Sequence, residues 1–133
     1  MFNRGNHSIY LIQYHIVFCT KYRYKALNSK IQTRLKEVIR GIADIYGFTI
    51  LEIEIMPEHV HIFVSTKPTD SPTSIVGKIK SVSAIRLFVE FPNLRKIFRD
   101  NCPLWSKGYF VCSIGNANPE TIRNYIKNQK FNS

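Results

Sequence analysis

Two histidines, His59 and His61, stand one residue apart in the stretch "MPEHVHIFV". Because the side chains of a strand alternate between its two faces, both imidazoles would leave the same face, with backbone positions about 7 Å apart. Two imidazole nitrogens at that spacing can converge on one ion, so the pair is a candidate metal or catalytic site. The alternative is a pair of exposed histidines that help to bind phosphate, and the spacing alone leaves both open.

The choice of ion follows from the ligands that stand near the pair. A zinc centre would want further soft ligands at short spacing, and the sequence offers none beside His59 and His61. A hydrated Mg²⁺ or Mn²⁺ suits a site with open positions better, although imidazole is a poor ligand for Mg²⁺. The pair therefore predicts weak binding that an oxygen ligand and the substrate complete.

The stretch "NYIKNQK" near the end of the chain places Tyr125 and Gln129 four residues apart, on one helix face. A phenol with a pKa of about 10 is a poor nucleophile at neutral pH. A metal ion beside it would polarise a scissile phosphate, and the amide oxygen of Gln129 could supply the missing ligand. The alternative is that Tyr125 is an amphipathic core aromatic and that Gln129 is solvated.

These residues need a scaffold, and the apolar pattern predicts one. Residues 9–20 are rich in β-branched and aromatic side chains and predict a strand. A helix should begin at Asn28 or Ser29 and end at Gly47. Its apolar stripe, at helical spacing, consists of Ile31, Leu35, Val38, Ile39 and Ile42.

A tight antiparallel hairpin should follow, with its turn at Pro57 and Glu58. In its first strand, residues 48–56, the alternation places Leu51, Ile53 and Ile55 on one face. In its second strand, residues 59–66, the aliphatic face toward the helices consists of Val60, Ile62 and Val64. The histidines then project from the opposite face.

A second helix should begin at Ser71 and Pro72. Its predicted apolar stripe consists of Ile75, Ile79, Val82 and Val89. Residues 90–103 look irregular or form a short helix, residues 109–114 form a strand, and a last helix starts at Asn118 and Pro119.

The resulting order is β-α-β-β-α-β-α, within one domain that spans residues 1–133. It predicts an α+β protein with a ferredoxin-like, RRM-like βαββαβ antiparallel sheet and a C-terminal helix that carries the tyrosine. Two helices should cover one face of the sheet. The other face should stay open, as in many nucleic-acid platforms.

The charge favours a polyanionic partner, because 19 Lys and Arg face 9 Asp and Glu, for a net charge of +10. Nucleic acid is favoured over membrane, since no segment is a clearly basic amphipathic anchor and none has the length of a membrane span. We expect no signal peptide, and reduced thiols at Cys19, Cys102 and Cys112, so the chain should act in the cytoplasm on nucleoid DNA.

The stretch "TKYRYK" interleaves cations with aromatic rings, a pattern that holds phosphates and stacks on unpaired bases. A solvated strand end is the alternative. The candidate DNA contacts in this stretch are Lys21, Tyr22, Arg23, Tyr24 and Lys25. On the second helix, Lys78, Lys80 and Arg86 are weaker candidates, because charge on a helix is usually a solvated face.

Four stretches in order resemble one family. They are "YHIVFCTKYR", "MPEHVHIFV", "LWSKGYFVCSIG" and "YIKNQ". Together they are similar to the small single-tyrosine transposases of the HUH endonuclease superfamily, the TnpA-type enzymes of minimal insertion sequences. The resemblance runs over nearly the whole chain.

The resemblance implies roles for the candidate residues. His59, His61 and Gln129 would be the ligands of Mg²⁺ or Mn²⁺, and Tyr125 would be the nucleophile. The tyrosine would cut single-stranded DNA, leaving a 5′-phosphotyrosine link and a free 3′-OH, and a later 3′-OH would rejoin the strands. The family recognises imperfect hairpins at element ends and acts as a homodimer in which the tyrosine helix can complete the partner's site.

Two rival functions stay open at this point. One is a domesticated relative that acts on chromosomal repeated hairpins with the same chemistry. The other is a non-catalytic nucleic-acid-binding domain with a ferredoxin-like sheet, which would leave His59, His61, Tyr125 and Gln129 without a reason to converge.

Overall fold

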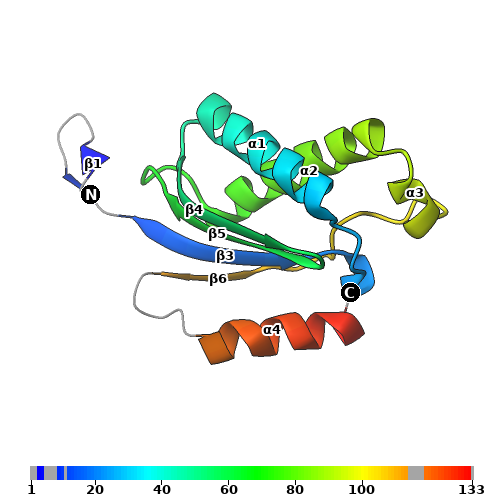
Figure 1. Ribbon diagram of the computed structural model, residues 1–133. Helices are drawn as coiled ribbons and strands as arrows, with labels where there is room; N and C mark the ends of the chain where they lie inside the picture. The colour runs from blue at the N-terminus through cyan, green and yellow to red at the C-terminus, as the bar shows by residue number, and fades with distance from the viewer. Residues whose placement is uncertain (1–2, 5–8, 11, 114–118, 133) are drawn as a thin grey trace.

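The computed structural model describes the backbone of residues 3–4, 9–10, 12–113 and 119–132, and the side chains of residues 12–113, 120 and 123–128. A four-stranded antiparallel sheet in the order β4-β5-β3-β6 forms its centre (Figure 1). The strands are β3 (Gln13–Cys19), β4 (Thr49–Met56), β5 (His59–Ser65) and β6 (Phe110–Ser113). The order confirms the predicted ferredoxin-like α+β fold.

Two long helices cover one face of this sheet, α1 (Ser29–Tyr46) and α2 (Pro72–Glu90) (Figure 1). The core lies between the helices and the sheet. Val60, Ile62 and Val64 of β5 are completely buried in it, so the predicted aliphatic face of this strand is confirmed.

The predicted helix boundaries rest on local capping. The side chain of Asn28 accepts a hydrogen bond from the amide of Ile31 at 3.0 Å, and α1 ends at Gly47 with φ of 78°, a conformation that favours glycine. At the start of α2, the Ser71 hydroxyl accepts from the amide of Ser74 at 3.1 Å, with proline at the first helical position. Each N-cap side chain satisfies an amide that has no partner inside its helix.

The prediction of one continuous strand over residues 9–20 is wrong. Gln13 pairs with Ser65, the last residue of β5, so positions before Gln13 find no partner strand in the main sheet within the described chain. Instead β2 (Ile9–Tyr10) pairs with β1 (Asn3–Arg4) in a separate two-stranded sheet.

The predicted face of β4 is wrong at one residue. A β-bulge interrupts its pairing with β5 between Ile50 and Glu52, and Leu51 is the inserted residue. Leu51 is therefore 38% exposed, and Ile50 packs against the core in its place. Beyond the bulge the alternation resumes, and Ile53 and Ile55 are buried as predicted.

The predicted stripe of α2 is wrong at its end, where Val89 is 72% exposed. The buried arc of the helix instead includes Ser83, whose hydroxyl accepts a hydrogen bond from the indole of Trp105 at 3.0 Å. Reading apolar residues alone misplaced the arc, because a serine with a buried partner occupies its middle.

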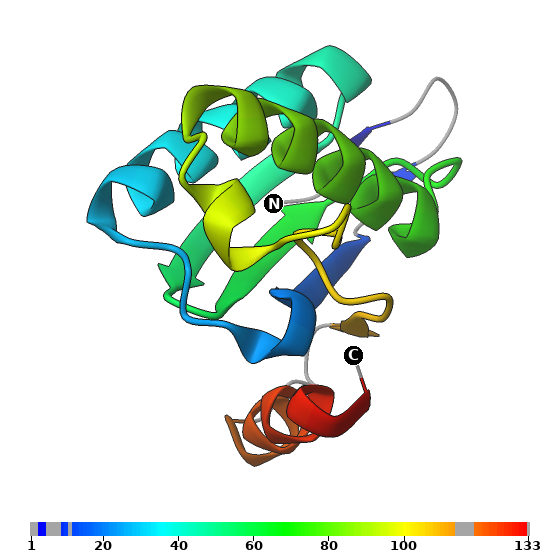
Figure 2. The same cartoon turned by 90° about the vertical axis from the view of Figure 1, so that its right-hand side faces the viewer.

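The opposite face of the sheet is not fully open, which corrects the prediction. The last helix, α4 (Pro119–Asn132), lies on that side, away from α1 and α2 (Figures 1 and 2). It packs against β3 and against the short 3₁₀ helix η1 (Lys21–Arg23). Its predicted N-cap, Asn118, lies outside the described residues.

Residues 90–103 contain a single short helix, α3 (Leu94–Ile97), as predicted. Cys19, Cys102 and Cys112 are free thiols. Among the helices described, none combines the length and the hydrophobicity needed to cross a membrane.

Candidate active site

His59 and His61 project together from the face of β5 opposite the core, as predicted. Each side chain is half-buried, with 16% of His59 and 25% of His61 exposed. On the neighbouring strand β3, Cys19 pairs with His59 and Val17 pairs with His61, so these four side chains share one face. Both imidazoles therefore lie at the centre of the sheet, in a site that is partly shielded from solvent.

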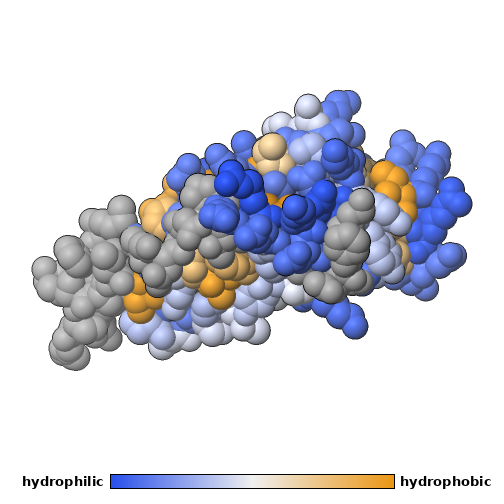
Figure 3. Space-filling model, turned by 90° about the horizontal axis from the view of Figure 1, so that it is seen from below, coloured by the Kyte–Doolittle hydropathy of each residue, from blue (hydrophilic) through white to orange (hydrophobic). Residues whose placement is uncertain are grey.

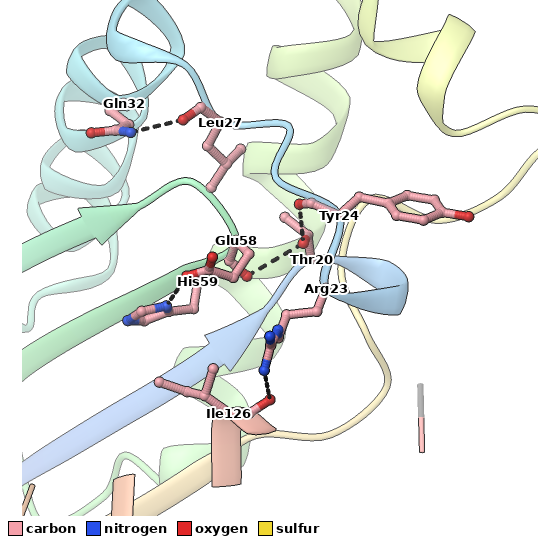
Figure 4. A network of polar contacts seen from close by, with 8 residues as sticks. All are labelled: Thr20, Arg23, Tyr24, Leu27, Gln32, Glu58, His59 and Ile126. Carbon is pink, nitrogen blue, oxygen red and sulfur yellow. Dashed lines mark hydrogen bonds and ion pairs between the residues drawn. The ribbon is translucent and has the colours of Figure 1, made fainter. Parts of the chain in front are cut away.

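The ring of His59 is held by its neighbour Glu58. The Nδ1 atom lies 2.7 Å from Oε1 of Glu58, and the Glu58 carbonyl in turn accepts from the hydroxyl of Thr20 at 3.3 Å (Figure 4). The same carbonyl accepts from the amide of Thr20 at 3.0 Å. A carboxylate accepts hydrogen bonds, so Nδ1 is the donor in this contact. In the neutral ring, Nε2 would then be the nitrogen left to hold a metal ion.

The ring of His61 is held from β3. Its Nε2 lies 3.1 Å from Nδ1 of His15, whose ring stacks on Phe63 with centroids 4.4 Å apart. Burial, and next to it the charge of His15, lower the pKa of His61 below its ordinary value. At neutral pH the imidazole is therefore neutral, the form that binds metals.

Helix α4 places Tyr125 on this same face. The ring lies against Phe110 of β6, with centroids 5.8 Å apart, and Phe110 pairs with Val17. Val17 thus stands between His61 on one side and Phe110 on the other, so the rows of His61 and Phe110 are about two strand spacings, or 10 Å, apart. The structure therefore brings the tyrosine and the histidines to one side of the sheet.

The hydroxyl of Tyr125 is buried and has no hydrogen-bond partner among the described residues. Burial first, and the nearby Cys19 second, raise the pKa of Tyr125 above its ordinary value. Cys19 is itself completely buried, and its pKa rises to about 12, mainly through burial. Both groups are protonated at neutral pH. Because Cys19 is the strand partner of His59, its proximity to Tyr125 places the tyrosine near the histidine pair.

The described residues fit a weak divalent site rather than a closed metal centre. Within the described ranges, no cluster of three His, Cys, Asp or Glu side chains forms. His59 and His61 could supply two imidazole nitrogens to such a site, and its further ligands would be oxygens. Gln129 follows Tyr125 by one turn of the continuous helix α4, but its side chain lies outside the described part.

Comparison with known proteins assigns the family. Residues 8–129 match the family model described as "Transposase IS200 like", which is most of the chain. The chain belongs to the IS200-like transposase family.

Two curated members of this transposase family are similar over most of their length. The chain is 32% identical over 127 residues to the ISDra2 transposase TnpA of Deinococcus radiodurans, which covers 95% of this chain and 89% of that protein. It is 32% identical over 123 residues to the transposase for insertion sequence element IS200 of Salmonella typhimurium, which covers 92% of this chain and 80% of that protein.

Solved structures share the fold. A crystal structure at 1.90 Å resolution, of a Deinococcus radiodurans protein assigned as a transposase, superposes with a TM-score of 0.88 at 31% identity and covers 96% of this chain and 97% of that chain. A REP-associated tyrosine transposase bound to a REP hairpin gives a TM-score of 0.57 at 16% identity, over 92% and 68% of the two chains. At that identity the second likeness speaks for the fold alone.

The basic stretch of this IS200-like protein lies on and after η1. Tyr22 and Tyr24 are 46% and 42% exposed, and Lys25 is exposed. Lys21 is only 9% exposed, and its ammonium lies 5.1 Å from the Tyr22 ring. Arg23 reaches α4, where its guanidinium donates to the carbonyl of Ile126 at 3.4 Å (Figure 4). The aromatic rings and Lys25 are thus the accessible part of the predicted DNA contact.

The three basic candidates of α2 differ in what they touch. Arg86 is exposed, and the ammonium of Lys78 lies 4.5 Å from the Tyr46 ring. Lys80 instead donates to the carbonyls of Ser106 at 2.8 Å and Gly108 at 2.7 Å. A phosphate contact by Lys80 would have to compete with these bonds, so its position indicates a structural role.

The face that carries α4 is predominantly hydrophilic, with small hydrophobic areas between (Figure 3). Sequence reasoning missed three residues on or beside this face, which are His15, Cys19 and Glu58. His15 and Cys19 do alternate with Val17 within one strand, which is a usable signal. Only the pairing of β3 with β5 puts them beside the histidine pair.

Proposed function

We propose that this transposase cleaves and rejoins single-stranded DNA at insertion-sequence ends, with Tyr125 as the nucleophile. One observation carries the proposal. A separate helix, α4, lays Tyr125 on the same face as His59 and His61, close to Cys19, the strand partner of His59. A phenol buried without a hydrogen-bond partner among described residues is unusual in a fold, and a catalytic role is one reason for such a group.

In the proposed reaction, the Tyr125 oxygen forms a bond to the phosphorus of a phosphodiester while the bond from phosphorus to the 3′ oxygen breaks. The phenol loses its proton and the leaving 3′ oxygen gains one, which leaves a 5′-phosphotyrosine and a free 3′-OH. Attack by a second 3′-OH reverses the step and releases Tyr125. One ester replaces another each time, so the exchange needs no separate energy source.

Because the pKa of Tyr125 is raised, the reaction needs a group that activates the phosphate. His59 and His61, with Gln129 as the proposed oxygen ligand, would hold Mg²⁺ or Mn²⁺. Such an ion supplies positive charge that polarises the phosphate and stabilises the transition state. The residues of this chain do the rest: Glu58 orients His59, and Phe110 positions the tyrosine ring.

The proposed substrate is single-stranded DNA with a hairpin near each element end, in the cytoplasm. The net charge of +10 and the exposed rings of Tyr22 and Tyr24 support binding to a flexible strand. The REP hairpin bound by a structure of the same fold supports hairpin recognition. Insertion-sequence ends are favoured over chromosomal repeats, because the relatives at 32% identity are insertion-sequence transposases.

We also propose a homodimer in which the tyrosine helix can serve its own sheet or the partner's. In a single chain α4 lies over its own sheet, where it packs mainly against η1 and β3 and places Tyr125 against Phe110 of β6. Mixing a His61→Ala protein with a Tyr125→Phe protein tests the sharing. Restored cleavage is expected, because one mixed site would keep an intact pair of histidines and an intact tyrosine.

The central test mixes the protein with a labelled, hairpin-bearing single strand taken from the DNA beside its own gene, plus Mg²⁺ or Mn²⁺. We expect an adduct that survives a denaturing gel and disappears with chelator and in Tyr125→Phe. An adduct that persists in Tyr125→Phe would show that another residue is the nucleophile. His59→Ala should lose cleavage and keep most DNA affinity, since affinity rests on phosphate contacts. An equal loss of both would favour the non-catalytic binding domain.

A further inference from the structure

His15 is a histidine that the proposed reaction does not use, although it touches the site. It lies on β3, and its Nδ1 atom is 3.1 Å from Nε2 of His61. The two residues are 46 positions apart in the chain, so the contact belongs to the pairing of β3 with β5. Because His15 pairs with Phe63 and His61 pairs with Val17, the two imidazoles meet on a diagonal of one sheet face.

The contact with His15 occupies Nε2, one of the two ring nitrogens of His61. The other, Nδ1, lies 4.0 Å from Oε2 of Glu54, beyond hydrogen-bond distance. A neutral imidazole carries one proton, so one nitrogen donates and the other accepts. If Nε2 of His61 donates to His15, the lone pair of His61 is left on Nδ1. If Nε2 accepts instead, His61 has no lone pair for an ion.

His59 shows the same arrangement from the other side of its ring. Glu58 holds Nδ1 of His59 and leaves Nε2 free. Ligating histidines are commonly fixed in this way, with the second ring nitrogen bonded to a carboxylate, carbonyl or other acceptor. His61 has no carboxylate at that distance in the described structure, and His15 stands where one would.

His15 is itself well fixed. Its ring stacks on Phe63 at 4.4 Å with an interplanar angle of 15°, and both side chains line a small pocket of about 140 Å³ with Glu52, Glu54 and His61. A ring clamped in this way presents Nδ1 in a fixed direction. It can therefore orient a neighbour, which a freely rotating surface histidine cannot.

We infer that His15 is a positioning residue that accepts the Nε2 proton of His61 and so leaves Nδ1 of His61 as the nitrogen that would hold a metal ion. The inference rests on the proposed metal-dependent function. It assigns opposite protonated nitrogens to the two ligands, Nδ1 in His59 and Nε2 in His61.

Two measurements test it without relying on cleavage. The first is long-range ¹H–¹⁵N NMR of the imidazoles in the metal-free wild-type protein, at neutral pH. We expect His61 to carry its proton on Nε2. A proton on Nδ1 of His61 overturns the inference whatever the variants do.

The second is Mn²⁺ binding followed by electron paramagnetic resonance. His15→Phe keeps the stacked ring and removes the acceptor, and we expect its Mn²⁺ affinity to fall roughly 10- to 100-fold. His15→Asn should stay within about threefold of wild type, because its amide oxygen can replace Nδ1 as the acceptor. Phe63→Leu tests packing alone: it loosens the stacking, leaves the acceptor in place and should lose less Mn²⁺ affinity than His15→Phe.

The outcomes separate this inference from the proposed function. Wild-type affinity in His15→Phe, together with lost affinity in His61→Ala, overturns the role of His15 and leaves the metal site intact. A wild-type protein that binds no Mn²⁺ overturns both. Equal losses in His15→Phe, His15→Asn and Phe63→Leu would show that packing, not the acceptor, matters, and would also overturn the inference.

Discussion

Tyr125 combines a buried hydroxyl with a position that offers it no described hydrogen-bond partner. In a purely structural tyrosine, burial of the hydroxyl would be offset by such a bond. Here the phenol is protonated, lies beside Phe110 and has no hydrogen-bond partner among the described residues, which costs stability and leaves the hydroxyl available for chemistry.

At this scale, Tyr125→Phe should separate stability from activity. The DNA adduct should disappear, while the free energy of unfolding in urea stays the same or rises by up to about 1 kcal/mol, because an unpaired buried hydroxyl is removed. Tyr109→Phe is the control. It loses a hydrogen bond to Thr73 and should cost about 0.5–1.5 kcal/mol while keeping the adduct. A Tyr125→Phe protein that is less stable than Tyr109→Phe would contradict this account.

The reactivity of Cys19 follows from the same dry environment. Burial raises its pKa to about 12, so the thiolate that reacts with alkylating agents is scarce at neutral pH. Iodoacetamide at pH 7.5 should modify Cys102 in the native protein and leave Cys19 intact until urea unfolds it. Mass spectrometry of the labelled peptides measures the order, and early labelling of Cys19 would mean that α4 does not cover it.

At the scale of elements, the bulge of β4 decides which of its residues stabilise the fold. Leu51→Ala should change the free energy of unfolding by less than about 0.5 kcal/mol, because its side chain is already exposed. Ile55→Ala, at the fourth pair beyond the bulge, should cost about 2–5 kcal/mol. Urea unfolding of both variants checks this, and similar costs would contradict the bulge.

Lys80 of α2 donates hydrogen bonds to the segment before β6. The pH dependence of stability can test whether its ammonium is buried there. Burial lowers its pKa to about 8, below the 10.5 expected in the unfolded chain. Between these values the unfolded chain binds more protons, so the contribution of Lys80 to stability rises with pH. Relative to Lys80→Met, the wild type should gain stability between pH 7.5 and 9 in urea unfolding. A constant difference would mean that the ammonium is not buried.

At the scale of the whole molecule, the charge of +10 predicts salt-dependent binding of single-stranded DNA. Each phosphate contact contributes about −0.7 to the slope of log affinity against log salt. Lys25→Ala should therefore flatten the slope by about that amount. Lys80→Met should not, because its ammonium is bonded to carbonyls of Ser106 and Gly108. Fluorescence anisotropy at several salt concentrations measures both, and equal slopes would remove Lys25 from the interface.

The features that depend on short-range periodicity and on capping residues could be predicted from the sequence. Alternation put His59 and His61 on the face opposite Val60, capping residues placed the ends of α1 and α2, and the order of elements predicted the sheet. Each of these rests on neighbours within a few positions, so one sequence carries the signal. The family also follows from stretches that can be read directly.

Which distant residues meet depends on the tertiary structure. It placed α4 over the face that was expected to be open, inserted a bulge at Leu51, and turned Lys80 from a candidate DNA contact toward backbone carbonyls. It also set His15 against His61. These outcomes depend on strand register and on the docking of remote segments, and a side chain's period along its own strand or helix carries no information about what is packed against it.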